Sequence, residues 1–352
     1  MHLFEPMSLR DVKLRNRIVV SPMCEYSAID GVPQTWHLVH LGSRAVGGAG
    51  LVIAEATAVE ARGRISPADT GIWNDAQSEA WTPIVSFIAE QGAVAGIQLA
   101  HAGRKASTAP PWVDKRTVAP DQGGWIPVDP SALAYSESYP TPVALDAQGI
   151  DDIVEAFRTA TRRAVDCGFR VIEIHAAHGY LLHQFLSPLS NQRTDQWGGS
   201  FENRIRFTRS VVSAVRSAMP ESLPLLVRIS ATDWVPGGWD IEQSIELSRQ
   251  LKVDGVDLVD VSSGGLSEHQ VIDAVPGYQV PFAARIREEA GVATSAVGLI
   301  TEAEQAEIIL KSGQADLVQL ARELLRDPYW PRCAAKELGV TIKPPKQYAR
   351  AW

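Results

Sequence analysis

The sequence has few cysteines and no long apolar segment. Only three of its 352 residues are cysteine, namely Cys24, Cys167 and Cys333, and no two form a C-x-x-C pair. A sparse, odd count argues against a disulfide scaffold and favours a reducing compartment. No run of 18 apolar residues occurs, which argues against a membrane span. The opening segment MHLFEPMSLRDVK lacks the apolar core of a secretory signal, so we expect a cytoplasmic protein.

A basic surface is also missing. The 33 Lys and Arg residues are outnumbered by 41 Asp and Glu residues, giving a formal net charge of −8, and no basic block occurs. This balance argues against nucleic acid as a partner. The hydrophobic fraction of 45% and the charged fraction of 21% are typical of globular proteins. A (β/α)₈ barrel takes roughly 250 residues, so the length fits one barrel with insertions or two ordinary domains.

Short apolar runs recur along the chain, separated by segments with helical periodicity. The runs cover residues 18–21, 51–56, 94–99, 171–175, 225–229, 258–262, 294–297 and 317–320. Such runs are typical of strands that are buried on both faces of a parallel sheet. Helices are expected at 151–167, 201–219, 241–251, 301–311 and 327–338. Eight alternating units predict an α/β fold, a (β/α)₈ TIM barrel forming one domain over 1–352.

Two segments are left over from the barrel pattern. Residues 103–149 follow the third predicted strand, are rich in proline, and show no sustained period. An insertion at this position is either an active-site lid or a decorative surface loop, and we favour the lid. The proline-containing segment 339–352 is predicted to be an extended C-terminal arm.

Polar residues follow several of the predicted strands. Catalytic groups of barrel enzymes converge at this rim. His175 and His178 are compatible with a donor pair for an oxyanion, with part of a metal site that would recruit His101 or Glu173, or with a structural role. Gly298 and the pair Ala321-Arg322 follow the last two strands, where barrels commonly bind phosphate; the alternative is a glycine turn and a surface arginine. No nucleotide-binding glycine motif is present.

Ten stretches of the chain follow a familiar order. They are Leu3-Phe4-Glu5-Pro6, Leu14-Arg15-Asn16-Arg17, Ser21-Pro22-Met23-Cys24, Gly47-Gly48-Ala49-Gly50, Glu55-Ala56-Thr57-Ala58-Val59, Gln98 to Lys105, His175 to Leu181, Asn191 to Asp195, Trp197-Gly198-Gly199-Ser200 and Glu202-Asn203-Arg204. With these stretches, which run in order from residue 3 to residue 204, the chain resembles the Old Yellow Enzyme family of FMN-dependent ene-reductases. Within that family it resembles the bacterial YqjM-like and xenobiotic-reductase-A-like subgroup.

The resemblance implies a role for each matching position. FMN would be bound by Ser21, Pro22, Met23, Cys24, Ala56, Gln98 and Arg228 around its ring system and by Gly298, Ala321 and Arg322 at its phosphate. His175 and His178 would bind the substrate's carbonyl or nitro oxygen, Tyr180 would supply a proton, and Tyr26 would shape the pocket. Cys24 would contact the flavin and tune its potential, the alternative being an inert thiol. No metal is expected.

The resemblance also implies an assembly and a reaction. Arg350, near the C-terminus, would reach the active site of a neighbouring subunit, which requires a homo-oligomer, either a dimer or a tetramer. Two departures from the family pattern are Ala321, where glycine is frequent, and Trp197, where tyrosine is usual. NADPH would reduce FMN, and an activated alkene (an enone, maleimide, nitro-olefin or quinone) would then accept hydride from flavin N5 and a proton from Tyr180 or water.

Three alternatives remain open at this point. The principal one is a metal-dependent TIM-barrel hydrolase that uses His175 and His178. A relative of the dienoyl-CoA reductases would need a cysteine cluster and a second nucleotide domain, and this chain has neither. A barrel that only binds a ligand would show no reductase turnover.

Overall fold

The barrel is built from the predicted apolar runs. The computed structural model describes residues 1–113 and 117–351. Within these residues, eight parallel strands close in the order β10, β11, β12, β3, β4, β5, β8, β9. Their bounds are Ile18–Val20 (β3), Leu51–Ala58 (β4), Val94–Ala100 (β5), Val171–Ala176 (β8), Leu225–Ser230 (β9), Leu258–Ser262 (β10), Ala293–Ala296 (β11) and Leu317–Leu320 (β12). Each begins within one residue of its predicted start, which confirms the TIM-barrel fold.

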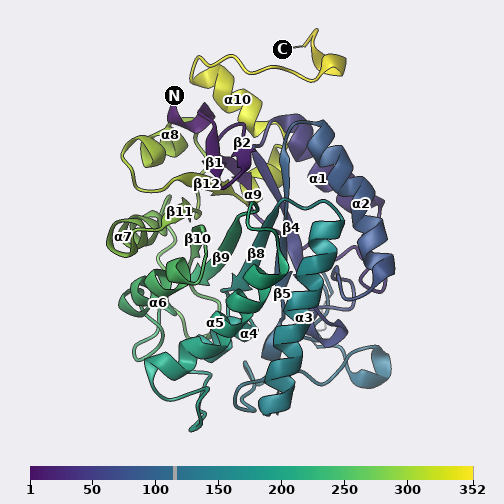
Figure 1. Cartoon of the computed structure of the whole chain (residues 1–352), viewed down its shortest axis with the longest axis vertical. Helices are drawn as coiled ribbons and strands as arrows, with labels where there is room; N and C mark the ends of the chain where they lie inside the picture. Colours follow the sequence, from purple (N-terminus) through teal and green to yellow (C-terminus); the bar gives the residue numbers. More distant parts are fainter. Residues whose placement is uncertain (114–116, 352) are drawn as a thin grey trace.

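Helices surround the barrel (Figure 1). They are α1 (Thr35–Gly47), α2 (Asp75–Glu90), α3 (Ala147–Asp166), α4 (Leu181–Leu186), α5 (Phe201–Ala218), α6 (Ile241–Val253), α7 (Val280–Ala290), α8 (Ala303–Lys311), α9 (Arg322–Arg326) and α10 (Trp330–Glu337). The five expected helices correspond to α3, α5, α6, α8 and α10. The sequence prediction did not specify α1, α2 or α7, which complete the outer ring.

The start of α3 corrects the predicted end of the insertion. The Asp146 side chain accepts a hydrogen bond from the Gly149 backbone N–H at 2.8 Å, which makes Asp146 the N-cap. A carboxylate in this position satisfies one of the free amide groups of the first turn. The predicted insertion therefore ends at residue 146, and residues 147–149 belong to the helix.

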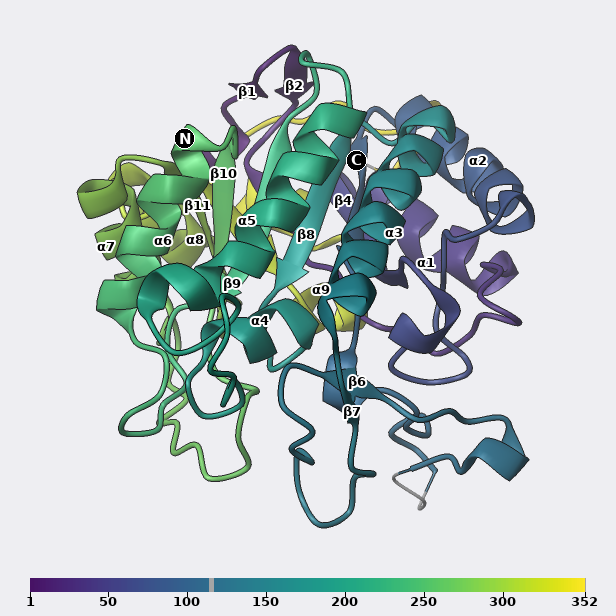
Figure 2. The ribbon, with the colours of Figure 1, turned by 60° about the horizontal axis from the view of Figure 1, so that its bottom comes forward.

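The insertion lies at the rim where the barrel strands end. In Figure 2 it hangs below the barrel, on the side toward which β8 points, whereas β1 (Met7–Leu9) and β2 (Val12–Leu14) lie at the opposite end. It contains two short strands, β6 (Val128–Asp129) and β7 (Val143–Ala144), and its residues 114–116 lie outside the described part of the chain. The C-terminal segment extends away from the barrel body (Figure 1). The arm predicted at 339–352 includes Trp352, which also lies outside the described part of the chain.

The barrel interior is apolar along most of each strand. All residues of β8, β9 and β10 are buried, and most are Leu, Ile or Val. The charged exceptions lie in the middle of these strands, namely Glu173 in β8, Arg228 in β9 and Asp260 in β10. No helix in the described residues combines the length and the apolar character that crossing a membrane would need.

Candidate active site

The predicted site residues come from seven of the eight barrel strands or from the segments that directly follow them. These residues are Ser21 to Cys24 after β3, Ala56 in β4, Gln98 in β5, His175 in β8, Arg228 in β9, Gly298 after β11 and Ala321-Arg322 after β12. Parallel strands in a barrel direct their carboxyl ends to one rim. The fold therefore brings these positions to the same end of the molecule.

His175 and His178 lie side by side with Tyr180. The two imidazole ring centroids are 5.2 Å apart, and the His175 ring lies 5.0 Å from the Tyr180 ring, in both cases edge to face. Burial, aided by the positive charge of Arg228, holds the pKa of both histidines well below the usual range. Both rings are therefore neutral near pH 7 and can donate a hydrogen bond without carrying charge.

Hydrogen bonds fix the orientation of each ring. The Ala177 backbone N–H donates to His175 Nδ1 at 3.3 Å, which leaves the ring proton on Nε2. Ser262 Oγ lies 2.7 Å from His178 Nε2, and the His178 backbone N–H donates to Ser230 Oγ at 2.9 Å. His178 itself has φ +58°, in the left-handed region.

Lys105 stabilises the turn that carries His178 through two hydrogen bonds. Its Nζ donates to the carbonyl oxygens of His178 and Gly265, both at 2.9 Å. The same ammonium group lies 5.0 Å from the centroid of the Tyr180 ring. Burial, with the charge of Arg104 nearby, lowers the pKa of Lys105 to about 7. In the sequence analysis, Lys105 belongs to the matching stretch Gln98 to Lys105 but has no predicted role.

Arg228 is held inside the barrel by two neighbours. Its Nε lies 2.9 Å from Asp260 Oδ2, and one terminal nitrogen donates to Ser21 Oγ at 3.1 Å. Gln98 Nε2 donates to Glu173 Oε1 at 2.7 Å. Burial raises the pKa of the Glu173 carboxyl, which the Asp260 carboxylate raises further. The sequence prediction named Glu173 only as a possible ligand of the metal alternative and missed Asp260, although a charged side chain inside an apolar strand signals a buried partner.

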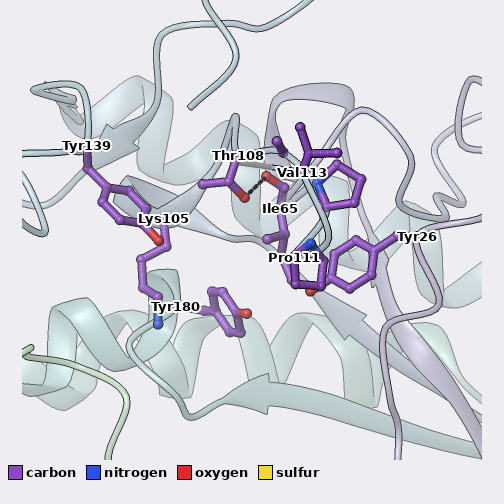
Figure 3. A pocket seen from close by; sticks show the side chains of 10 residues that line it. Tyr26, Ile65, Lys105, Thr108, Pro111, Val113, Tyr139 and Tyr180 are labelled. Atoms are coloured by element: carbon purple, nitrogen blue, oxygen red, sulfur yellow. Dashed lines mark hydrogen bonds between the residues drawn. The ribbon is translucent and has the colours of Figure 1, made fainter. Parts of the chain in front are cut away.

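A cavity of about 530 Å³ opens beside Tyr180 (Figure 3). Tyr26, Lys105, Tyr139 and Tyr180 line it together with insertion residues 108–111 and 113 and with Ile65. Thr108 Oγ1 donates to the Ile65 backbone oxygen at 3.0 Å, which fastens the insertion to the loop after β4. Tyr26 therefore lines a cavity next to Tyr180, its role in a substrate pocket stays a prediction, and Tyr139 is a lining residue that the sequence prediction did not name.

A smaller cavity of about 200 Å³ lies between the ends of β11 and β12. Its lining includes Gly298, Ala321 and Arg322, the three predicted phosphate positions. Gly298 has φ +122°, and a Cβ there would approach Gln279 Nε2 to 2.9 Å, so glycine is required. Among the described residues, Arg322 has no hydrogen-bonding or ion-pair partner. An unpartnered guanidinium beside a small cavity fits an anionic group such as the phosphate of FMN.

Two of the predictions from the sequence do not involve residues of these two cavities. Arg350 is exposed on the C-terminal segment and lines neither of the two cavities described above. The metal alternative finds no support, because the described residues contain no cluster of three or more His, Cys, Asp or Glu side chains suited to a metal ion. His101, a suggested third ligand, instead lies with Nε2 2.8 Å from Glu60.

Comparison with known proteins identifies the family. The model of the NADH:flavin oxidoreductase / NADH oxidase family matches residues 2–340. The NADPH dehydrogenase of Geobacillus sp. (strain WCH70) is 50% identical over 352 residues, covering 99% of this chain and 98% of that protein. The NADPH dehydrogenase of Bacillus subtilis (strain 168) is 48% identical, covering 99% of each.

Solved structures agree with this match. The Old Yellow Enzyme homologue from Zymomonas mobilis superposes with a TM-score of 0.81 at 28% identity, covering 97% of this chain and 94% of that one. Family, relatives and fold coincide over almost the whole chain. The chain belongs to the NADH:flavin oxidoreductase / NADH oxidase family, as an FMN-dependent NADPH dehydrogenase of the Old Yellow Enzyme group.

Proposed function

We propose that this enzyme reduces the C=C bond of activated alkenes, namely enones, maleimides, nitro-olefins and quinones, with electrons from NADPH. The observation that carries the proposal is the neutral pair of the buried His175 and the half-buried His178, next to Tyr180, which lines the 530 Å³ cavity. Such a pair suits an oxygen atom that gains negative charge during the reaction.

The cofactor would lie between the two cavities. FMN supplies the hydride from N5 when bound. We assign its ring system to Ser21, Pro22, Met23, Cys24, Ala56, Gln98 and Arg228, and its phosphate to Gly298, Ala321 and Arg322. The Arg228 guanidinium, fixed by Asp260 at 2.9 Å, provides a positive charge where the reduced ring system carries its negative charge.

The histidines would polarise the substrate. His175 Nε2 carries the ring proton and has no partner among the described residues, so its N–H is free to bind a carbonyl or nitro oxygen. His178 is held beside His175 by its contact with Ser262 and by the hydrogen bond from Lys105 to its carbonyl oxygen. Donors that are already oriented stabilise developing charge without reorganising, and each contributes roughly 3 kcal/mol in comparable oxyanion sites.

Tyr180 would hold the proton that the substrate receives. Burial raises the pKa of its phenol well above the usual value, so the group stays protonated at neutral pH. Its position on the cavity wall favours protonation of the substrate by Tyr180, with water as the alternative donor. Residues 108–113 and Tyr139 cover the cavity, which supports a lid role for the insertion.

The C-terminal segment would act in a homo-oligomer, either a dimer or a tetramer. The segment extends from the barrel and carries the exposed Arg350, which supports its insertion into the site of a second subunit (Figure 1). An arginine there would add a donor for the anionic end of a substrate.

The test is a titration with p-hydroxybenzaldehyde, a phenol that mimics the anionic oxygen of the reacting substrate. In the parent enzyme it should bind and give a long-wavelength charge-transfer absorbance. His178→Ala should weaken binding about 10- to 100-fold, because a buried charged oxygen loses one donor. Tyr180→Phe is the matched control: it should keep phenol binding but slow alkene reduction. Equal phenol affinity in His178→Ala and the parent would contradict the assignment.

A further inference from the structure

Glu55 occupies an irregular position in the barrel wall. The pairing of β4 with β5 runs Ala54 to Ile97 and then Ala56 to Gln98, so Glu55 is skipped. A residue in such a bulge turns its side chain out of the regular alternation. Glu55 is nevertheless 3% exposed, which makes it a buried carboxylate outside the ladder.

The Glu55 carboxylate connects two other segments. His37 Nε2 of α1 lies 3.0 Å from Glu55 Oε1, and the Glu25 backbone N–H donates to Glu55 Oε2 at 3.1 Å. His37 Nδ1 accepts the Gln34 N–H at 2.9 Å, which leaves the ring proton on Nε2, the atom that lies 3.0 Å from Glu55 Oε1. The bulge, α1 and the segment after β3 therefore meet at one carboxylate.

The segment held in this way is the one that carries Cys24 and Tyr26. Glu25 is additionally fixed through its side chain, which accepts a hydrogen bond from Trp36 Nε1 at 2.8 Å and lies 3.4 Å from His40. Tyr26 follows with φ +48°, a conformation that a side chain other than glycine rarely adopts without support. The backbone anchor at Glu25 lies directly between Cys24 and Tyr26, and Tyr26 lines the 530 Å³ cavity.

We propose that Glu55 is a positioning residue that holds Cys24 and Tyr26 in place by accepting the Glu25 N–H, and that its negative charge keeps the Cys24 thiol unreactive. This proposal rests on the proposed function in one respect, because it takes Cys24 to face the flavin and Tyr26 to face the substrate.

The surroundings of Cys24 support this role. Burial raises the pKa of the Cys24 thiol well above its usual value, and the carboxylates of Asp69, Glu55 and Glu25 raise it further. The thiolate is the reactive form of cysteine. Removing one of these charges therefore makes Cys24 more reactive.

Two substitutions separate the hydrogen bond from the charge. Glu55→Gln keeps an oxygen that can accept the Glu25 N–H but removes the charge, whereas Glu55→Ala removes both. Glu60→Gln is the matched control, since Glu60 follows the same strand and also lies against a buried histidine, His101, at 2.8 Å. Within the described part of the chain, its side chain makes hydrogen bonds or ion pairs with Arg62 and His101 but with none of residues 21–26, so Glu60→Gln should leave both measurements below at parent values.

Two measurements on the FMN-loaded enzyme then test the proposal without turnover. The first is labelling by iodoacetamide, read by peptide mass spectrometry as the ratio of Cys24 to the exposed Cys333 in the same molecule. The second is hydrogen exchange at the Glu25 amide. We expect Glu55→Gln to raise the labelling ratio severalfold with little change in exchange. Glu55→Ala should raise the labelling ratio and also speed exchange at Glu25 severalfold.

An unchanged labelling ratio in folded Glu55→Gln, or an unchanged Glu25 exchange rate in folded Glu55→Ala, would overturn the proposal. If Glu55→Ala does not fold, the labelling ratio of Glu55→Gln decides alone. Neither readout depends on alkene reduction, so both can succeed even where the proposed reaction is refuted. If Glu55 served stability alone, substituting it would lower the midpoint of unfolding but would leave the labelling ratio and the Glu25 exchange rate unchanged.

Discussion

The two ends of the proposed FMN site are built differently. At the ring end, Arg228, Gln98 and His178 are each bonded to a neighbouring side chain. At the phosphate end, Arg322 lies beside a small cavity and has no partner in the described residues. The ring end is thus organised by the protein itself, whereas the phosphate end offers a donor for a ligand to satisfy. Substitutions should therefore act on folding at the first end and on binding at the second.

The largest effect is expected for Arg228→Ala. The substitution leaves Asp260, which is fully buried, without its cation and close to a second buried carboxyl, Glu173. Breaking a buried pair in this way costs about 3–5 kcal/mol. Urea unfolding, with and without added FMN, measures the loss.

An exposed ion pair provides the control for this prediction. Arg209 pairs with Asp254 at 2.6 Å, but the arginine side chain is 40% exposed. Arg209→Ala should cost less than about 1 kcal/mol, because water screens exposed pairs. If Arg228→Ala and Arg209→Ala lowered the unfolding free energy equally, the ring end would be no more dependent on its internal ion pair than the protein surface is.

Arg322→Ala should show the opposite behaviour. The dissociation constant for FMN is expected to rise about 10- to 100-fold, as for the loss of a hydrogen bond to a charged group. The unfolding free energy of the apoprotein should stay within about 0.5 kcal/mol of the parent, because Arg322 bonds to no described residue. Fluorescence titration of apoprotein with FMN measures the first quantity. A destabilised apoprotein with unchanged FMN affinity would contradict the comparison.

Lys105→Met tests the part of the ring end that faces the substrate. The variant loses both hydrogen bonds to the His178 and Gly265 carbonyls, so the His178 ring should shift. A small misplacement of a catalytic group lowers the rate, here about tenfold in kcat/KM for cyclohexenone. FMN affinity should be unchanged and is the internal control. A parallel loss of FMN affinity would show that Lys105 supports the whole site.

A further prediction concerns how the stability of the protein depends on pH through Asp69. Burial raises the pKa of this carboxyl to about 7, although Ser66 Oγ donates to it at 2.7 Å. The folded protein therefore holds a proton there that the unfolded chain releases near pH 4, so the unfolding free energy should fall as the pH rises from about 4 to 7. Asp69→Asn should flatten this slope by roughly 1 kcal/mol per pH unit. A slope identical to that of the parent would show that Asp69 is ionised throughout.

The sequence predicts the barrel and much of the rim, for reasons that are local. Buried parallel strands are continuous apolar runs, and each run gives the start of its strand within one residue and the end within two. That Gly298 and Ala321-Arg322 line one cavity also follows from position, since they come after two neighbouring strands; their binding of phosphate stays a prediction.

What the sequence could not predict depends on contacts between distant segments. The pair of Arg228 with Asp260 joins two strands, and the Lys105 contacts join three separate segments. The bulge at Glu55 is a property of strand register, which the apolar run 51–56 does not encode. The start of α3 was missed because Gly149 in the first turn has the character of a loop residue.

The most direct test of the account is an anaerobic titration of the purified enzyme. NADPH should bleach the flavin absorbance, and one equivalent of cyclohexenone should restore it while yielding one equivalent of cyclohexanone. A flavin that NADPH bleaches but cyclohexenone leaves bleached until oxygen is admitted would contradict alkene reduction at this site.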